Sequence, residues 1–229
     1  MRVAPCGNIG VPVLDAVRDP SGFDVFVVEI SSYQLHYLPS EGPGMPRPWA
    51  ACCLNIAEDH LDWHGSFEAY IAAKAKVYQN TEYACVYNRA DLHTLEMVER
   101  ADVVEGARAI SFGLDSPGRS ELGIVEGILC DRAFLDDRAN TAVELSTLDE
   151  LADVGLDAPH IVANILAAAA LARSLEVSPP VIHEALMGFA MDAHRIRTIA
   201  TADGVRWVDD SKATNPHAAH ASLAACVSV

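Results

Sequence analysis

Apolar positions in the first half of this chain fall into short, nearly continuous runs. The clearest run is FDVFVVEIS, residues 23–31, which is rich in β-branched and aromatic residues. A run of this kind is typical of a strand that is covered on both faces. WAACCLNI, YACVYN and AISFG follow further along the chain. The pattern therefore predicts four strands in this half of the chain.

Segments with helical spacing separate these runs. SYQLHYL is long enough for a short helix, and ADLHTLEMVERA has apolar residues at helical intervals. SFEAYIAAKAKVYQN opens with Ser66 and Glu68, which suit the cap and first turn of a helix. Strands that alternate with helices indicate an α/β fold, with a mostly parallel sheet and helices on both faces.

The pattern changes after residue 120. ELGIVEGILCDRAFL contains two short alternating segments, which predict an antiparallel hairpin at a sheet edge. APHIVANILAAAALARSL and PPVIHEALMGF read as helices, the second with proline at its start.

The last segment reads as a separate unit. RTIATADGVRWVDDS reads as two strands joined by an Asp-Gly turn, and ATNPHAAHASLAA begins a further helix. A hairpin and one helix are too little for a domain. We therefore interpret the chain from about residue 190 onward as the opening of a second, Rossmann-like α/β domain.

The net charge, the cysteine pattern and the lengths of the apolar runs exclude some classes of protein. The 229 residues carry a formal net charge of −16, which argues against binding nucleic acid through the whole surface. It does not argue against a phosphorylated substrate held by a local group of donors. The six cysteines form no CxxC pair, the first ten residues lack the apolar core of a signal peptide, and no apolar run reaches membrane length. We expect a cytoplasmic protein with no membrane partner.

Polar residues follow two of the predicted strands. Glu29 and Ser31 end the first run, and LNIAEDHLDWHG delivers Glu58, Asp59 and His60 after the second. If these strands are neighbours, Glu29 and His60 face one crevice at the carboxyl ends of the sheet, where ligands bind. A carboxylate and an imidazole, with water, suit Mg²⁺ or Mn²⁺. From this stretch alone, the favoured alternative is that the acids cap a helix and the histidine is an ordinary surface residue.

A zinc site is a weaker reading of the same stretch. His60 and His64 are spaced one helical turn apart, but Leu61 stands where the zincin motif has its glutamate.

Lysine is rare in this chain and therefore informative. Lys74 and Lys76 lie among alanines on one predicted helix, and Lys212 is the third and last lysine. A lysine tail in such a place usually covers apolar surface. The alternative is that Lys74 projects toward the crevice and acts on phosphate or metal.

VDDSKATN, residues 208–215, lies between a predicted strand and a predicted helix. Asp210 can accept from a ribose hydroxyl, and Lys212 and Thr214 can bind phosphate or carboxylate near a helix N-terminus. The alternative is a well-capped turn. The neighbouring pair His194 and Arg195 adds a guanidinium suited to phosphate. Together these residues suggest nucleotide and anion chemistry between two domains.

Five motifs occur here in the order seen in the Mur ligases, and the chain resembles that family over nearly its whole length. The motifs are EISSYQL, LNIAEDHLDWHG, YIAAKAKVY, the His-Arg pair and VRWVDDSKATNPHAA, and GNIG near the start also fits. Tyr33-Gln34-Leu35 and the DSKATN run make the resemblance closest to the family member that adds D-glutamate.

The resemblance implies roles for individual residues. Glu29 and His60 match positions that bind magnesium, and Lys74 matches a lysine that CO₂ converts to a carbamate, which ligates a second ion. Asn8 and Ser31 match contacts to the UDP-muramoyl substrate. The remaining matches are Asn164, Arg195 and Asp210 for the nucleotide, and Lys212 and Thr214 near the phosphates and the incoming amino acid.

The resemblance also implies a reaction. ATP with Mg²⁺, for which Mn²⁺ can substitute, phosphorylates the carboxylate of UDP-N-acetylmuramoyl-L-alanine. The amine of D-glutamate then attacks the acyl phosphate to form an amide. The substrates would all be small molecules, and the resemblance makes no prediction of oligomeric state.

The sequence departs from the family in two places. It contains no GxxxxGK[ST] phosphate loop, and Ile161 replaces the first asparagine of the family's H-N-x-x-N pattern. We therefore expect residues 1–189 to be the central, ATPase-type domain without its phosphate-loop strand and helix. Residues 190–229 would then be the first part of the C-terminal domain. On this view the chain alone has little or no ligase activity, and exposed apolar edges favour association.

Two alternatives remain open at this point. One is another amide ligase of the Mur or folylpolyglutamate type. The other is a non-catalytic nucleotide-binding module, which the absent phosphate loop favours.

Overall fold

A computed structural model describes residues 1–39, 42, 44–192, 195–213 and 216–224. Its strands are β1 (Val3–Gly7), β2 (Val25–Glu29), β3 (Ala50–Cys53), β4 (Ala84–Asn88), β5 (Arg108–Phe112), β6 (Glu121–Val125), β7 (Ile128–Asp131), β8 (Val143–Thr147), β9 (Arg197–Ala202) and β10 (Val205–Asp209). Its helices are α1 (Val13–Val17), α2 (Ser32–Tyr37), α3 (Leu61–His64), α4 (Phe67–Ala75), the 3₁₀ turn η1 (Lys76–Tyr78), α5 (Leu92–Glu99), α6 (Leu148–Asp153), α7 (Pro159–Ser174), α8 (Pro179–Met187) and α9 (Pro216–Ala224).

The central sheet has six strands in the order β3-β4-β5-β6-β7-β8. The strands from β3 to β6 pair in parallel, and β7 and β8 are added antiparallel. This confirms the predicted α/β fold with a mostly parallel sheet. The predicted hairpin is β6–β7, but its expected position at the sheet edge is wrong, because β8 pairs with β7 and forms that edge.

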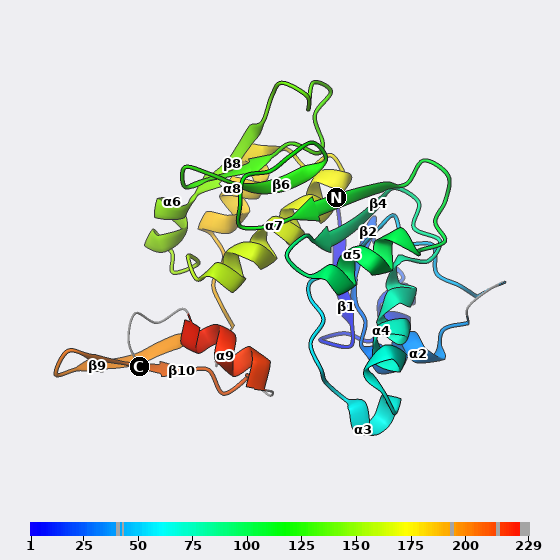
Figure 1. The fold of residues 1–229 in the computed structure, drawn as a ribbon, viewed down its shortest axis with the longest axis horizontal. Helices are drawn as coiled ribbons and strands as arrows, with labels where there is room; N and C mark the ends of the chain where they lie inside the picture. Colours follow the sequence, from blue (N-terminus) through cyan, green and yellow to red (C-terminus); the bar gives the residue numbers. More distant parts are fainter. Residues whose placement is uncertain (40–41, 43, 193–194, 214–215, 225–229) are drawn as a thin grey trace.

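Helices cover both faces of this sheet, as the alternation of elements predicts (Figure 1). Successive residues of β4 point to opposite faces: Ala84 and Val86 belong to a large core with α7 and α8, and Cys85 belongs to a second core with α4 and α5. Tyr78 of η1 is fully buried in the second core. Its hydroxyl accepts from Cys53 N at 2.9 Å and donates to Val86 O at 2.7 Å, so it joins β3 to β4.

Strands β1 and β2 form a separate parallel pair rather than part of the central sheet. Residues Phe26, Val27 and Val28 of β2 are 40%, 53% and 38% exposed. The prediction that this run is covered on both faces is therefore wrong for the described residues. Its partner among them is β1, and the buried side chains of this unit, Ala4 and Cys6, lie on β1 beside α1.

Strands β9 and β10 form an antiparallel hairpin that lies with α9 apart from the central sheet (Figure 1). Both residues of the Asp203-Gly204 turn have positive φ, 52° and 77°, as a tight two-residue hairpin turn requires. The predicted strand, turn and strand are thus confirmed. None of the helices in the described part of the chain has the length and apolar character needed to cross a membrane.

Candidate functional site

The segment 54–60 leaves the carboxyl end of β3 without regular secondary structure. Ile56 is buried in the second core and fixes the middle of the segment. Beyond it, Glu58 and His60 are exposed. His60 adopts a left-handed backbone conformation with φ of 55°, and its ring Nδ1 lies 3.4 Å from the carboxylate of Asp59. A buried anchor thus presents a short polar loop at the end of the sheet.

The carboxyl ends of β1 and β2 meet at a second polar point. Asn8 N donates to Glu29 O at 2.8 Å, and both residues are exposed. A side chain at Gly7 would come within 2.1 Å of Glu29 O, so glycine is required for this approach. Ser31 caps α2, accepting from Gln34 N at 3.2 Å. The structure therefore brings Asn8, Glu29 and Ser31 to one end of the β1–β2 pair.

Helices α2 and α3 connect these two points. The ring of Tyr33 lies 4.9 Å from that of His60 and 4.7 Å from that of Trp63, measured between centroids. Ser32 Oγ lies 3.0 Å from His64 Nε2. Strands β2 and β3 do not pair, so the condition set for Glu29 and His60 to face one crevice is not met directly. The contact that the structure shows is instead between α2, which follows β2, and α3, which follows the loop that ends at His60.

The imidazole of His64 sits in this contact. Desolvation lowers its pKa, and the nearby side chains of His36, His60 and Lys74 lower it further. His64 is therefore neutral near pH 7, and Ser32 occupies its Nε2. Among the residues that the structure describes, no three His, Cys, Asp or Glu side chains form a metal-binding group.

The two lysines of α4 and η1 have different environments. Lys76 Nζ donates to the carbonyls of His36 and Leu38, at 2.9 and 2.7 Å, and so fastens the end of α2. Lys74 Nζ instead lies 5.7 Å from the ring centroid of Tyr70 and lines a cavity. Burial raises the pKa of the Cys53 thiol to about 11, and the charge of Lys74 opposes this rise. Lys74 is therefore close to the end of β3.

The cavity has a volume of about 980 Å³ and lies between the loop 54–60, α4, α7 and the segments on either side of the β9–β10 hairpin. One part of its wall is apolar, from Leu54, Leu156, Ile161, Ile165, Leu186, Phe189, Met191 and Ile196. The polar lining consists of Asn55, Glu58, Asp59, Tyr70, Lys74, His160, Asn164, Asp192, Arg195, Asp210, Lys212 and Ser222. An apolar wall beside cations is an arrangement that suits a flat base joined to phosphates.

The β9–β10 side of the cavity is organised around Asp210. Its carboxylate accepts from Ile196 N at 3.1 Å and from Ser222 Oγ at 2.5 Å. Lys212 Nζ lies 4.0 Å from the carboxylate of Asp192. These contacts link the segment after α8 to the hairpin and to α9.

Helix α7 supplies the opposite side. His160 and Asn164 are one turn apart, and both face the cavity. Desolvation lowers the pKa of His160, and the carboxylate of Asp210 opposes this effect. Sequence reasoning missed His160, although its spacing of four residues from Asn164 was visible. It also missed Tyr70 and Ser222, which lie on the cavity because of the fold.

Five predicted site residues meet in this cavity, namely Lys74, Asn164, Arg195, Asp210 and Lys212. Four others, Asn8, Glu29, Ser31 and His60, are not among its lining residues and lie around the ends of β1, β2 and β3. His194 and Thr214 lie outside the described residues.

Comparison with known proteins shows which family this chain is similar to. The family model for the Mur ligase middle domain matches residues 7–172. The chain is 68% identical over 228 residues to the UDP-N-acetylmuramoylalanine–D-glutamate ligase of Leifsonia xyli subsp. xyli, covering 100% of this chain and 44% of that protein. It is 55% identical over 229 residues to the enzyme of that name from Streptomyces avermitilis, covering 100% of this chain and 47% of that protein.

Among solved structures, the MurF ligase from Thermotoga maritima in complex with ADP matches with a TM-score of 0.64 and 21% identity. The match covers 98% of this chain and 50% of that one. The chain thus spans less than half the length of the curated relatives named above. Because the family model matches most of its residues and the fold is shared, this chain belongs to the Mur ligase family.

Proposed function

We propose that this chain is the nucleotide-binding part of an ATP-dependent ligase that adds D-glutamate to UDP-N-acetylmuramoyl-L-alanine, a step in peptidoglycan precursor synthesis. The observation that carries the proposal is the 68% identity over 228 residues to a relative named for that ligation. The cavity supports it, because five predicted positions, three of them cationic, converge there beside an apolar wall.

The proposed ligation has two steps, phosphoryl transfer and amide formation. The substrate carboxylate attacks the γ-phosphorus of ATP, and ADP leaves. The amine of D-glutamate then attacks the acyl carbon, loses a proton, and inorganic phosphate leaves as the amide forms. The acyl phosphate must be kept from water, and a cleft between two units with an apolar wall suits that task.

Residues of the cavity take the nucleotide in this proposal. Asn164 contacts the base, with Ile161 and Ile165 beside it as apolar surface. Arg195 binds phosphate through its planar guanidinium. Asp210 accepts from the ribose while Ile196 N and Ser222 Oγ hold its carboxylate in place. Lys212 lies near the phosphates.

Glu29 and His60 are proposed to hold Mg²⁺ or Mn²⁺. The described residues build no three-ligand cage of their own, but Mg²⁺ commonly takes one or two protein ligands and completes its shell with water and phosphate oxygens. One carboxylate oxygen and one imidazole nitrogen would fit that demand, although β2 and β3 do not pair. The ion, when bound, offsets charge on the transferred phosphoryl group.

Lys74 is proposed to act as a carbamate that ligates a second ion. Its ammonium group lines the cavity and, among the residues that the structure describes, has no backbone carbonyl partner of the kind that holds Lys76. Conversion to a carbamate turns a cation into an oxygen ligand.

The UDP-muramoyl substrate is proposed to contact Asn8 and Ser31, and Thr214 to lie near the incoming amino acid. We further propose that residues 1–189 form the central domain and residues 190–229 the first part of the C-terminal domain. The substrates are small molecules of the cytoplasm, where we place the protein.

The test uses protein purified from the complete reading frame that contains this sequence. We expect phosphate release that requires ATP, Mg²⁺, UDP-N-acetylmuramoyl-L-alanine and D-glutamate together, with the amide product identified by mass spectrometry. Lys74→Ala should lower turnover about 10- to 100-fold, as loss of a metal-site residue does. The matched control is Lys76→Arg, two residues further on, which keeps a cationic donor for the carbonyls at the end of α2 and should keep turnover near the parent value.

Amino-acid substitution in the same assay separates the rival functions. Product with another amino acid but none with D-glutamate would identify a different amide ligase. Nucleotide binding without any product would favour a non-catalytic module. The carbamate is tested apart from activity, by ¹³C NMR after incubation with labelled bicarbonate, where Lys74→Ala should lack a carbamate signal that Lys76→Arg retains.

A further inference from the structure

The loop 54–60 has no regular structure, yet two side chains from one turn hold its first part. Asn88 Nδ2 donates to Leu54 O at 3.1 Å. Asp91 Oδ2 accepts from Ile56 N at 2.6 Å. Both side chains belong to the turn 88–91, which joins β4 to α5. The loop therefore takes its position from a neighbouring strand's turn as well as from its own strand.

The turn 88–91 is itself well fixed. Asn88 Oδ1 accepts from Ala90 N at 3.0 Å, and Asp91 Oδ1 accepts from His93 N at 3.0 Å as the cap of α5. The hydroxyl of Thr94, a fully buried residue, donates to Asn88 O at 2.8 Å and to Asp91 O at 3.0 Å. One carboxylate oxygen of Asp91 thus accepts from the first turn of α5, and the other accepts from the loop 54–60.

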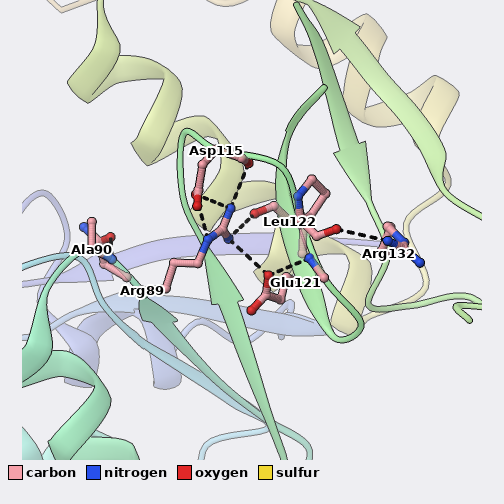
Figure 2. Close-up of polar contacts among 9 residues, drawn as sticks. Arg89, Ala90, Asp115, Glu121, Leu122 and Arg132 are labelled. Carbon is pink, nitrogen blue, oxygen red and sulfur yellow. Dashed lines mark hydrogen bonds and ion pairs between the residues drawn. The ribbon is translucent and has the colours of Figure 1, made fainter. Parts of the chain in front are cut away.

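Arg89 fastens the other side of the turn (Figure 2). Its guanidinium donates to the carboxylate and the carbonyl of Asp115 and to Leu122 O, each at 2.8 Å. A side chain at Gly113 or Gly123 would come within 2.7 or 2.8 Å of this guanidinium, so both glycines make room for it. The turn is therefore clamped between the loop 54–60 and the connection from β5 to β6.

The loop carries chemistry that depends on position. Ile56, held by Asp91, is two residues before Glu58 and four before His60. Groups that hold a metal or a phosphate work only when they are placed within about half an ångström. A hydrogen bond from backbone N–H to a carboxylate is charge-assisted and roughly twice as strong as a neutral one. Asp91 is therefore suited to fix the loop as well as to cap α5.

We propose that Asp91, supported by Asn88, is a positioning residue for the loop that carries Glu58, Asp59 and His60. This proposal rests on the proposed function only for the chemistry of the loop. The effect of Asp91 on the position of the loop can be measured without an activity assay. A plain helix cap is the competing role, and it predicts no special effect on the loop.

The first test is hydrogen exchange measured by mass spectrometry on protein from the complete reading frame. In Asp91→Ala we expect the peptide that contains Ile56 to exchange about 10- to 100-fold faster, because a charge-assisted bond is lost. The matched control is Thr147→Ala, which removes the side-chain cap of α6 at a distant place. It should leave exchange at Ile56 unchanged.

The second test is Mn²⁺ binding in the presence of ADP, followed by electron paramagnetic resonance. Asp91→Ala should weaken Mn²⁺ binding about 10-fold or more, as outer contacts to a metal site do, and Thr147→Ala should not. If Asp91→Ala fails to fold, Asp91→Asn decides, because it keeps volume and an acceptor while removing the charge. It should still exchange several-fold faster at Ile56.

Equal exchange at Ile56 in the Asp91 variants and the parent, or equal effects of Asp91→Ala and Thr147→Ala, would overturn the proposal. Absence of ligation with D-glutamate would overturn the proposed function instead and leave the exchange result standing.

Discussion

Single side chains make several of the long-range links in this fold. Asp131 is fully buried at the end of β7, and its carboxylate accepts from Ala133 N, Phe134 N and Arg173 Nε at 2.7, 3.0 and 2.8 Å. Arg173 also donates to Val177 O and Phe134 O, at 2.9 and 3.1 Å. This pair joins the antiparallel end of the sheet to the end of α7, whose beginning lines the cavity.

Asp131→Asn should therefore destabilise the protein strongly. Removing one partner leaves the guanidinium of Arg173 buried without its counter-charge, which typically costs about 3–5 kcal/mol. Chemical denaturation measures the change in free energy of unfolding. The control is Glu96→Gln, in the exposed pair with Arg100, where a loss under about 0.5 kcal/mol is expected. A loss at Asp131 as small as that of the control would contradict the argument.

The site residues show which chemistry a sequence can reveal on its own. The Lys74 position was identifiable because a lysine among alanines is unusual, and the structure separates it from Lys76. His160 and Ser222 were not identified, since their place on the cavity depends on how α7 and α9 pack. Asp91 was not identified either, because its contact with Ile56 joins residues 35 positions apart in the sequence.

At the scale of elements, the alternation of runs predicted β2 to β7 and most helices, and the hairpin β9–β10 followed from its Asp-Gly turn. Strands β1 and β8 and helices α1, α3 and α6 were not predicted. A readable signal existed for α6, because Thr147 and Glu150 form a capping box at its start. The prediction that both faces of β2 are covered was wrong. An apolar run indicates that a strand can be buried, but it does not show which elements pack against that strand.

The contact between α2 and α3 should respond to pH. Desolvation and nearby cations lower the pKa of His64 in the folded protein, so the unfolded chain binds a proton more readily as pH falls below the ordinary histidine value of about 6.5. Protonation of His64 therefore favours unfolding. The free energy of unfolding should decline from pH 7 toward pH 5, in part because of this residue.

Denaturation of the parent and of His64→Gln at both pH values measures this effect. The variant should lose less stability on acidification than the parent, because it has no imidazole to protonate. A parent and variant with the same loss between the two pH values would show that His64 does not contribute.

At the scale of the whole molecule, β2 is an apolar strand with exposed side chains. Its residues Phe26, Val27 and Val28 are exposed, and such an edge pairs readily with other chains. The net charge of −16 opposes association but does not cover this strand.

The 229-residue chain should therefore self-associate, and Val27→Lys should reduce the association. A charge on an edge strand hinders pairing, and Val27 is 53% exposed and so tolerates it. Sedimentation velocity over a range of concentrations measures the mass distribution. A parent chain that stays monodisperse and monomeric at the highest concentration would contradict this prediction.

The central claim is that the cavity between α7 and the β9–β10 unit holds a nucleotide. The most direct measurement is photo-crosslinking of protein from the complete reading frame with an azido-adenine analogue of ATP, with the labelled peptides mapped by mass spectrometry. The account predicts label in α7 around Ile161 and Asn164 or in the segment from Phe189 to Ile196, suppressed by excess ATP. The account would be contradicted if the label appeared only in other peptides and excess ATP suppressed that labelling.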